Sequence, residues 1–197
     1  MAERKRRSFL RRDLEYMKDY TVSVSGETIY TGPLYAFNGD PEEHRALFRR
    51  FAVLSGAMVV LMLVCGFLRV AAMSRSSVVT LAYGFGLLAC FALLVSCLRL
   101  VRSKQPMERR AFDTSFARLR WLPGISAVLA AAAIIAALVF VFTRRDIPFR
   151  LPDGVFLAGQ AAVAVMGAAI FLSAQGLLYH VIEPETAEAE TEPEPEE

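Results

Sequence analysis

The sequence has few of the residues that would support chemistry. Its 197 residues include two histidines and one tryptophan, and its cysteines are Cys65, Cys90 and Cys97. All three cysteines lie in apolar stretches and none is near a His, Asp or Glu, which favours packing roles over a metal site or a secreted disulfide framework. Helices can still bring two of them together. Because no catalytic constellation or nucleotide loop is present, we expect neither an enzyme nor a bound cofactor or metal.

Charge is missing from four long stretches of the chain. The run from Val78 to Leu98 has no Asp, Glu, Lys or Arg, and about 20 helical residues cross a bilayer core of ~30 Å. The sequence therefore predicts an all-α membrane protein, a bundle of four transmembrane helices. The expected spans are about 51–72, 78–101, 121–142 and 154–182.

Polar segments flank this membrane domain, which we place at residues 41–182. Residues 1–40 form a basic N-terminal segment, and residues 183–197 form an acidic, proline-rich tail that we expect to be disordered. Within the first segment, residues 8–18 fit either a short amphipathic helix on an anionic membrane face or a solvated N-terminus. Because polar sequence continues to about Arg50, the first span and not a cleavable signal peptide is expected to direct insertion.

A short alternating segment follows the basic start. Residues 20–31 alternate in polarity around Gly26 and Glu27, a pattern that predicts a β-hairpin with a type II′ turn in which Val24 lies opposite Ile29. An isolated hairpin is marginally stable in water, so it must pack on the membrane face, a loop or a partner. Docking of a partner is the alternative to a purely structural role.

Residues typical of helix ends predict where some of the spans begin. Asp40 and Pro41 predict the start of a helix that continues without a stop signal to the region of Ser74. Residues 105–120 predict a separate amphipathic helix in the headgroup region. Pro123 then falls in the first turn of the third span, where its missing N–H costs little.

Two sets of residues are candidates for contacts. Small and polar residues that face other helices are expected at Gly84, Gly86, Gln160, Ala164, Gly167, Ala174 and Gln175. Residues that contact lipid headgroups are expected at Arg49, Arg50, Arg109, Arg110, Arg118, Arg120 and Trp121.

Basic residues also predict the orientation. Lys and Arg are more numerous on the side that holds the N-terminus, so the positive-inside rule places both termini in the cytoplasm of a protein of the cell membrane. The basic start and the acidic tail would then share a compartment and attract each other weakly, in a salt-dependent way. The expected partners are the bilayer with its anionic headgroups and another membrane protein or a second copy of the chain, and no nucleic acid.

The predicted membrane interior argues against transport. A transporter or proton relay carries ionisable groups at mid-membrane, and the four apolar cores have none. We therefore expect a non-catalytic accessory, scaffold or regulatory subunit. The alternative is a small transporter or an oligomeric channel lined by backbone or hydroxyl groups.

Overall fold

The computed structural model describes residues 16–17, 19–22, 28–103, 105–144 and 148–182. Four long helices dominate this part of the chain: α2 (Pro41–Phe67), α4 (Ser77–Arg102), α5 (Arg109–Thr143) and α6 (Leu151–Gln175). Each of the four is long and apolar enough to cross a membrane. The sequence prediction of four apolar helices is confirmed.

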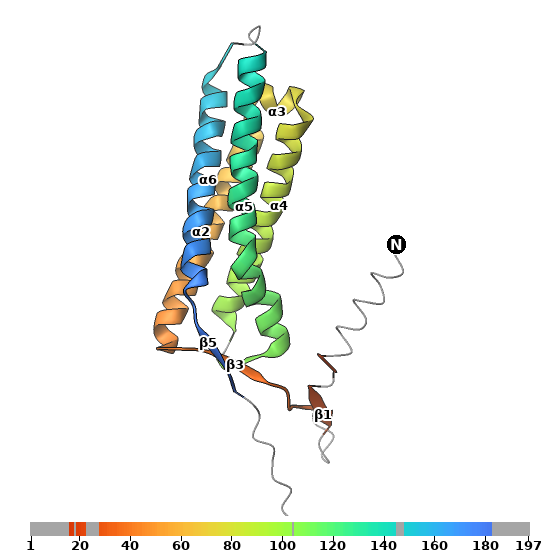
Figure 1. Ribbon diagram of the computed structural model, residues 1–197, viewed down its shortest axis with the longest axis vertical. Coiled ribbons are helices and arrows are strands. Elements are labelled where there is room, and N and C mark those ends of the chain that lie inside the picture. Colours follow the sequence, from red (N-terminus) through yellow and green to blue (C-terminus); the bar gives the residue numbers. More distant parts are fainter. Residues whose placement is uncertain (1–15, 18, 23–27, 104, 145–147, 183–197) are drawn as a thin grey trace, which may run out of the picture.

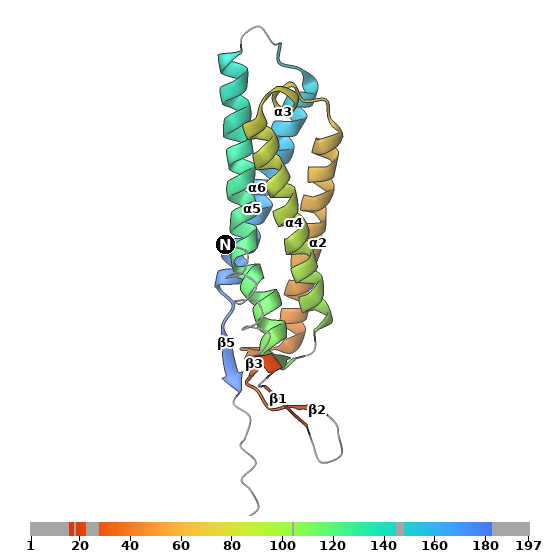
Figure 2. The same cartoon turned by 90° about the vertical axis from the view of Figure 1, so that its right-hand side faces the viewer.

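The four helices form an up-down bundle (Figures 1 and 2). Helices α2 and α5 each pack against both α4 and α6, so the four helices close a ring. Large apolar side chains that are fully buried fill its interior. They include Met58, Met62, Leu93, Phe156 and Ile170. This filled core is held by close packing of apolar groups rather than by a polar network.

Helix α2 begins as predicted but ends earlier. The Asp40 side chain accepts a hydrogen bond from the backbone N–H of Glu42 at 3.0 Å and caps the first turn. The helix ends at Phe67 instead of continuing to the region of Ser74, and the short α3 (Ala71–Arg75) follows. A tertiary contact fixes the start of α3: the Ala71 N–H donates to Asp153 Oδ1 of α6 at 3.2 Å, and no local sequence signal predicts this partner.

Helix α5 corrects two further predictions. The amphipathic segment at residues 105–120 is not a separate interfacial helix, because α5 is continuous from Arg109 to Thr143. Pro123 therefore lies well inside a helix and not in a first turn. Proline has no N–H to give to the carbonyl of Leu119 and commonly bends a helix, and Figure 1 shows that α5 changes direction in its lower part.

Two small sheets lie at one end of the bundle. In the first, β1 (Tyr20–Val22) pairs with β2 (Thr28–Tyr30). The second is antiparallel, with β3 (Leu34–Phe37) between β4 (Met107–Glu108) and β5 (Tyr179–Ile182). We call the end of the bundle that carries them the sheet end. It is the lower end in Figure 1.

Strand β5 corrects the predicted fourth span, because residues 179–182 form a strand and not the end of a helix. It also belongs to a second sheet that the prediction of an all-α protein with one hairpin did not include. Helix α6 ends at Gln175, with Gly176 as its C-cap. The chain then turns and pairs with β3, which places Tyr179 opposite Phe37. Backbone pairing with a strand distant in sequence replaces the helical hydrogen bonds there.

The predicted hairpin is present with another register. Ile29 lies opposite Thr21 and not opposite Val24, so the connection between the strands is longer than a two-residue turn. The predicted turn at Gly26 and Glu27 lies outside the described residues, as do the acidic tail and all of the N-terminal segment before Tyr16. Tyr16 and Met17 are helical.

Candidate functional site

An aromatic cluster joins three distant segments at the sheet end. The rings of Tyr35 and Phe112 stack with their centroids 4.4 Å apart. Tyr179 packs against Phe112 at 4.8 Å, and Phe37 packs against Phe116 at 5.0 Å. The apolar face of the first turns of α5 is thus covered by β3 and β5. In the sequence this same face suggested contact with lipid.

Both histidines of the sequence contact one asparagine beside this cluster. His44 Nε2 lies 2.9 Å from the Asn38 carbonyl oxygen, and His180 Nδ1 lies 2.5 Å from Asn38 Oδ1. The Asn38 N–H also donates to the carbonyl of Leu178 at 3.0 Å. Asn38 therefore connects the first turn of α2 to the segment that forms β5, which the sequence reasoning missed because it placed His180 in a helix.

The hairpin is fixed to the bundle by tyrosine hydroxyls. Tyr20 donates to Glu108 Oε2 at 2.6 Å, and this hydrogen bond, with burial as the second cause, raises the pKa of Tyr20 to about 12. The Tyr30 hydroxyl accepts from the N–H of Arg109 at 3.0 Å. Burial is the main cause that raises the pKa of Tyr30. The hairpin thus contacts β4 and the first residue of α5. Tyr16, which precedes the hairpin, donates a further hydrogen bond of 3.0 Å to Asp113 of α5.

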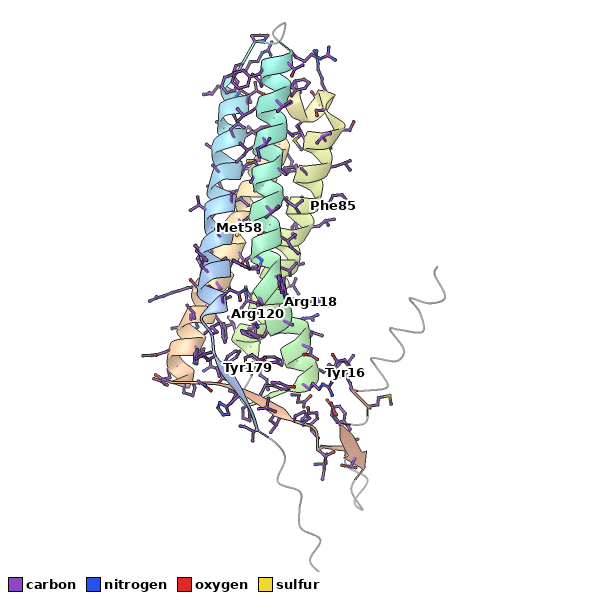
Figure 3. The ribbon with its side chains drawn as sticks, in the orientation of Figure 1. Tyr16, Met58, Phe85, Arg118, Arg120 and Tyr179 are labelled. Carbon is purple, nitrogen blue, oxygen red and sulfur yellow. The ribbon has the colours of Figure 1, made fainter. Side chains whose placement is uncertain are left out.

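The predicted headgroup residues all lie toward the sheet end. Arg118 and Arg120 extend from the lower part of α5 (Figure 3). Except for Arg109, which is partly buried, every member of the set is exposed, and Trp121 is 65% exposed. Arginines at the other end of the bundle bound the opposite side of the apolar region. The described ones are Arg69, Arg75, Arg144 and Arg150.

The spacing between these two sets matches a bilayer. On α5 the interval from Arg120 to Arg144 is about 24 residues, or ~36 Å of helix. The interval from Arg75 to Arg99 also covers about 24 residues, most of which lie in α4. A hydrocarbon core of ~30 Å fits between such boundaries.

The polar residue Gln175 lies at the edge of this region and not at depth. Its Nε2 donates to the carbonyl of Arg120 at 3.3 Å, and Arg120 Nε donates to Gln175 Oε1 at 3.1 Å. Both side chains are exposed. This reciprocal pair joins the end of α6 to α5 close to Pro123.

The predicted small packing residues differ in their surroundings. At Gly167 an added Cβ would lie 2.9 Å from the carbonyl oxygen of Pro123, and at Gly86 it would lie 3.2 Å from Met62 Cε. At Gly84 it would meet nothing within 4 Å. Ala174 is buried and Ala164 is half-buried. Close helix approach therefore requires glycine at Gly167, whereas Gly84 has open space beside it.

Gln160 is a fully buried polar side chain within a span. Its Nε2 contacts Met62 Sδ at 3.2 Å across the interface of α6 and α2. Its Oε1 has no hydrogen-bond partner among the described residues.

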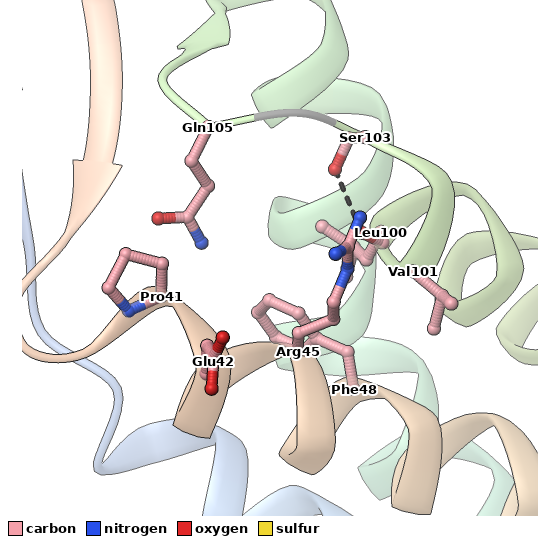
Figure 4. A pocket seen from close by; sticks show the side chains of 8 residues that line it. All are labelled: Pro41, Glu42, Arg45, Phe48, Leu100, Val101, Ser103 and Gln105. Carbon is pink, nitrogen blue, oxygen red and sulfur yellow. Dashed lines mark hydrogen bonds between the residues drawn. The ribbon is translucent and has the colours of Figure 1, made fainter.

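A pocket opens at the sheet end between the start of α2 and the end of α4 (Figure 4). Its volume is about 340 Å³. Arg45 extends toward Ser103, whereas the Glu42 carboxylate lies near Pro41. Phe48 and Leu100 give it apolar walls. A guanidinium and a carboxylate over an apolar wall are suited to a polar group that carries an apolar chain.

No feature of the described residues indicates catalysis or a conventional metal centre. Among them, no group of three or more His, Cys, Asp or Glu side chains is placed to hold a metal ion. No protein-family model, no curated protein and no solved structure matches this chain.

Proposed function

We propose that this protein is an integral membrane protein whose four long helices span the bilayer as a bundle. Large apolar side chains on the outside of all four helices support this proposal. Examples are Val60, Phe85, Val128 and Val165. Apolar side chains exposed around a whole bundle are costly in water and favourable in lipid.

The charges support an orientation with the sheet end in the cytoplasm. Described arginines at that end are Arg45, Arg49, Arg50, Arg99, Arg102, Arg109, Arg110, Arg118 and Arg120, against the four at the opposite end. The positive-inside rule assigns the richer side to the cytoplasm. Strands β1 and β5, which lead to the two termini, lie at the same end, so both termini would be cytoplasmic. These arginines would contact anionic headgroups, and the pocket with Arg45 would lie at headgroup level.

The most specific feature of that end is the exposed edge strand β5. Every residue from Tyr179 to Ile182 is exposed, and Val181 is 48% exposed. An exposed edge strand offers unpaired backbone groups to another extended chain. We therefore propose a non-catalytic accessory or regulatory subunit that binds a protein partner through β5. The buried side chains of Met58, Phe156 and their neighbours fill the bundle interior in the described part of the chain, which supports this role over transport by a single chain.

Purification of the tagged protein from its native membrane in mild detergent, followed by mass spectrometry, tests this role. A stoichiometric partner is expected with the natural sequence. Val181→Lys should abolish its recovery, because a charge on an edge strand opposes strand pairing. Ile29→Lys is the matched control, since Ile29 is 50% exposed on the other sheet and should leave recovery unchanged.

Two results would contradict the proposal. Recovery of the chain alone, as a monomer or a homo-oligomer, would remove the evidence for an accessory role. Solute flux in vesicles that contain only this protein would then favour the small transporter or oligomeric channel. Equal loss of the partner with Val181→Lys and Ile29→Lys would contradict β5 as the binding surface.

A further inference from the structure

The pocket between the start of α2 and the end of α4 presents two opposite charges to one space (Figure 4). Glu42 and Arg45 are three residues apart on α2, so both side chains start from one face of the helix. They then diverge, because the guanidinium of Arg45 extends toward Ser103 and the Glu42 carboxylate stays near Pro41. The positive and the negative charge therefore lie on different sides of the pocket.

The polar groups of this pocket can reach a ligand. The cap of α2 is made by Asp40, which accepts the N–H of Glu42 at 3.0 Å, so the Glu42 carboxylate is not used in it. Glu42 and Arg45 are both exposed. Gln105, in the connection between α4 and β4, points its amide group into the same space. The pocket therefore offers N–H donors from Arg45 and Gln105 and a carboxylate acceptor from Glu42.

Apolar side chains form the walls of the pocket and continue along α4. Phe48 and Leu100 are buried, and Val101 is half-buried. Leu98 and Leu94 stand three and seven residues before Val101, on the same face of α4, and Leu98 is 40% exposed. An apolar track therefore leads from the charged mouth of the pocket toward the middle of α4.

The position of the pocket along the bundle also bears on its ligand. Arg49 lies one turn after Arg45 on α2, and Arg99 and Arg102 end α4. These residues belong to the arginines of the sheet end that would contact headgroups. In the proposed bilayer the charged mouth of the pocket would lie among the headgroups, and the apolar track would lie in the hydrocarbon.

We propose that this pocket binds a zwitterionic phospholipid whose headgroup carries a primary ammonium, as in phosphatidylethanolamine. Arg45 and Gln105 donate hydrogen bonds to its phosphate, and Glu42 accepts a hydrogen bond from its ammonium. One acyl chain follows the apolar track along α4. The pocket volume of about 340 Å³ is near the lower limit for small-molecule sites, which suits a headgroup and not a whole lipid. This inference rests on the proposed membrane-spanning bundle.

The two charges distinguish this headgroup from others. A glycerol headgroup has no cation to pair with Glu42, so the carboxylate would only repel the lipid phosphate. A choline group is positive but has no N–H to donate, and proteins usually bind it in a cage of aromatic rings. Phe48 is the one aromatic side chain among the described residues that line the pocket.

Native mass spectrometry of the purified full chain in detergent, titrated with lipids of identical acyl chains, tests the site. Phosphatidylethanolamine should bind about 10-fold more tightly than phosphatidylcholine or phosphatidylglycerol, because one charge-assisted hydrogen bond contributes roughly this factor. Glu42→Gln should remove the preference, and Arg45→Gln should weaken the binding of all three lipids. Glu43→Gln is the matched control, because Glu43 is the other acid in the first turn of α2 and does not line the pocket. It should keep the preference.

Three results would overturn the proposal. The first is equal affinity for the three lipids, and the second is an equal effect of Glu42→Gln and Glu43→Gln. The third concerns soluble glycerophosphoethanolamine, which has the same headgroup without acyl chains and should compete only weakly. Binding of this molecule as tightly as the lipid would show that the ligand is not taken from the bilayer.

Alkaline carbonate treatment of native membranes separates failure of this site from failure of the proposed function. A chain that stays in the membrane and binds the three lipids equally would overturn the lipid site alone. A chain that carbonate releases would overturn the spanning bundle and the lipid site with it. The lipid titration does not depend on the accessory role, because it uses the isolated chain.

Discussion

His180 Nδ1 lies 2.5 Å from Asn38 Oδ1, although 142 residues separate the two. This contact links the segment before α2 to the strand that follows α6. Asn38 directly follows β3 and His180 lies in β5, so the contact lies beside the antiparallel pairing of these two strands. Contacts between the segment before α2 and the segment after α6 therefore close the sheet end.

Asn38→Ala should loosen β5 without unfolding the bundle. It removes one hydrogen bond of ordinary strength, so we expect a loss of about 0.5–1.5 kcal/mol that is local to the sheet. Hydrogen exchange should become faster at Tyr179–Ile182 and stay unchanged in the interior of α4. Unchanged exchange in β5 would show that the His180 contact contributes nothing to its docking.

Tyr20 should titrate later than an ordinary tyrosine. Its pKa of about 12 in the folded protein lies above the usual tyrosine value of 10.0. The contribution of the neutral Tyr20 hydroxyl to folding stability is therefore complete below pH ~10 and is lost as the pH rises through about 12. Glu108→Gln removes the charged acceptor and should lower the Tyr20 pKa toward 10. Nuclear magnetic resonance of ¹³C-labelled tyrosine measures both values. An equal pKa in the two proteins would contradict the role of Glu108.

The effect of an added charge on membrane insertion should depend on its position along the bundle axis. Phe85 is 58% exposed in the apolar region (Figure 3), and Phe85→Arg should raise the free energy of membrane insertion by about 2.5–3.5 kcal/mol. Met17→Arg is the control, because Met17 is exposed at the sheet end. Insertion measured with a glycosylation reporter should fall for the first variant only. Equal insertion of both would contradict the proposed span.

The two glycines Gly84 and Gly167 should respond in opposite directions to alanine. Gly167→Ala forces a methyl group to within 2.9 Å of a backbone oxygen of α5, and overpacking of this kind costs about 1–3 kcal/mol. Gly84→Ala meets open space and should be neutral or stabilise α4 by up to about 1 kcal/mol, since alanine is the better helix former. Thermal unfolding in detergent compares the two. A loss of stability at Gly84 equal to that at Gly167 would contradict this assignment.

The sequence by itself predicted the four long helices and one hairpin. Charge-free runs of bilayer length, flanked by arginines, are local features of the sequence. They predict helices reliably because an α-helix satisfies its backbone hydrogen bonds within the segment itself. The start of α2 at Asp40 and Pro41 was predicted for the same reason, since its cap bonds within one turn. The choice of Gly167 as a packing residue came from its spacing of seven residues from both Gln160 and Ala174, which places the three on one face of the helix.

Only the tertiary structure decided where helices break and what their ends contact. Helix α2 ends at Phe67, and the new helix α3 begins at Ala71, where Asp153 of α6 accepts the backbone N–H. The segment Tyr179–Ile182 is a strand because β3 supplies its backbone partners. Phe112, on a face that the sequence assigns to lipid, stacks on Tyr35 instead. In each case the deciding partner is distant in sequence, so a periodic pattern shows that a face is apolar but not what will cover it.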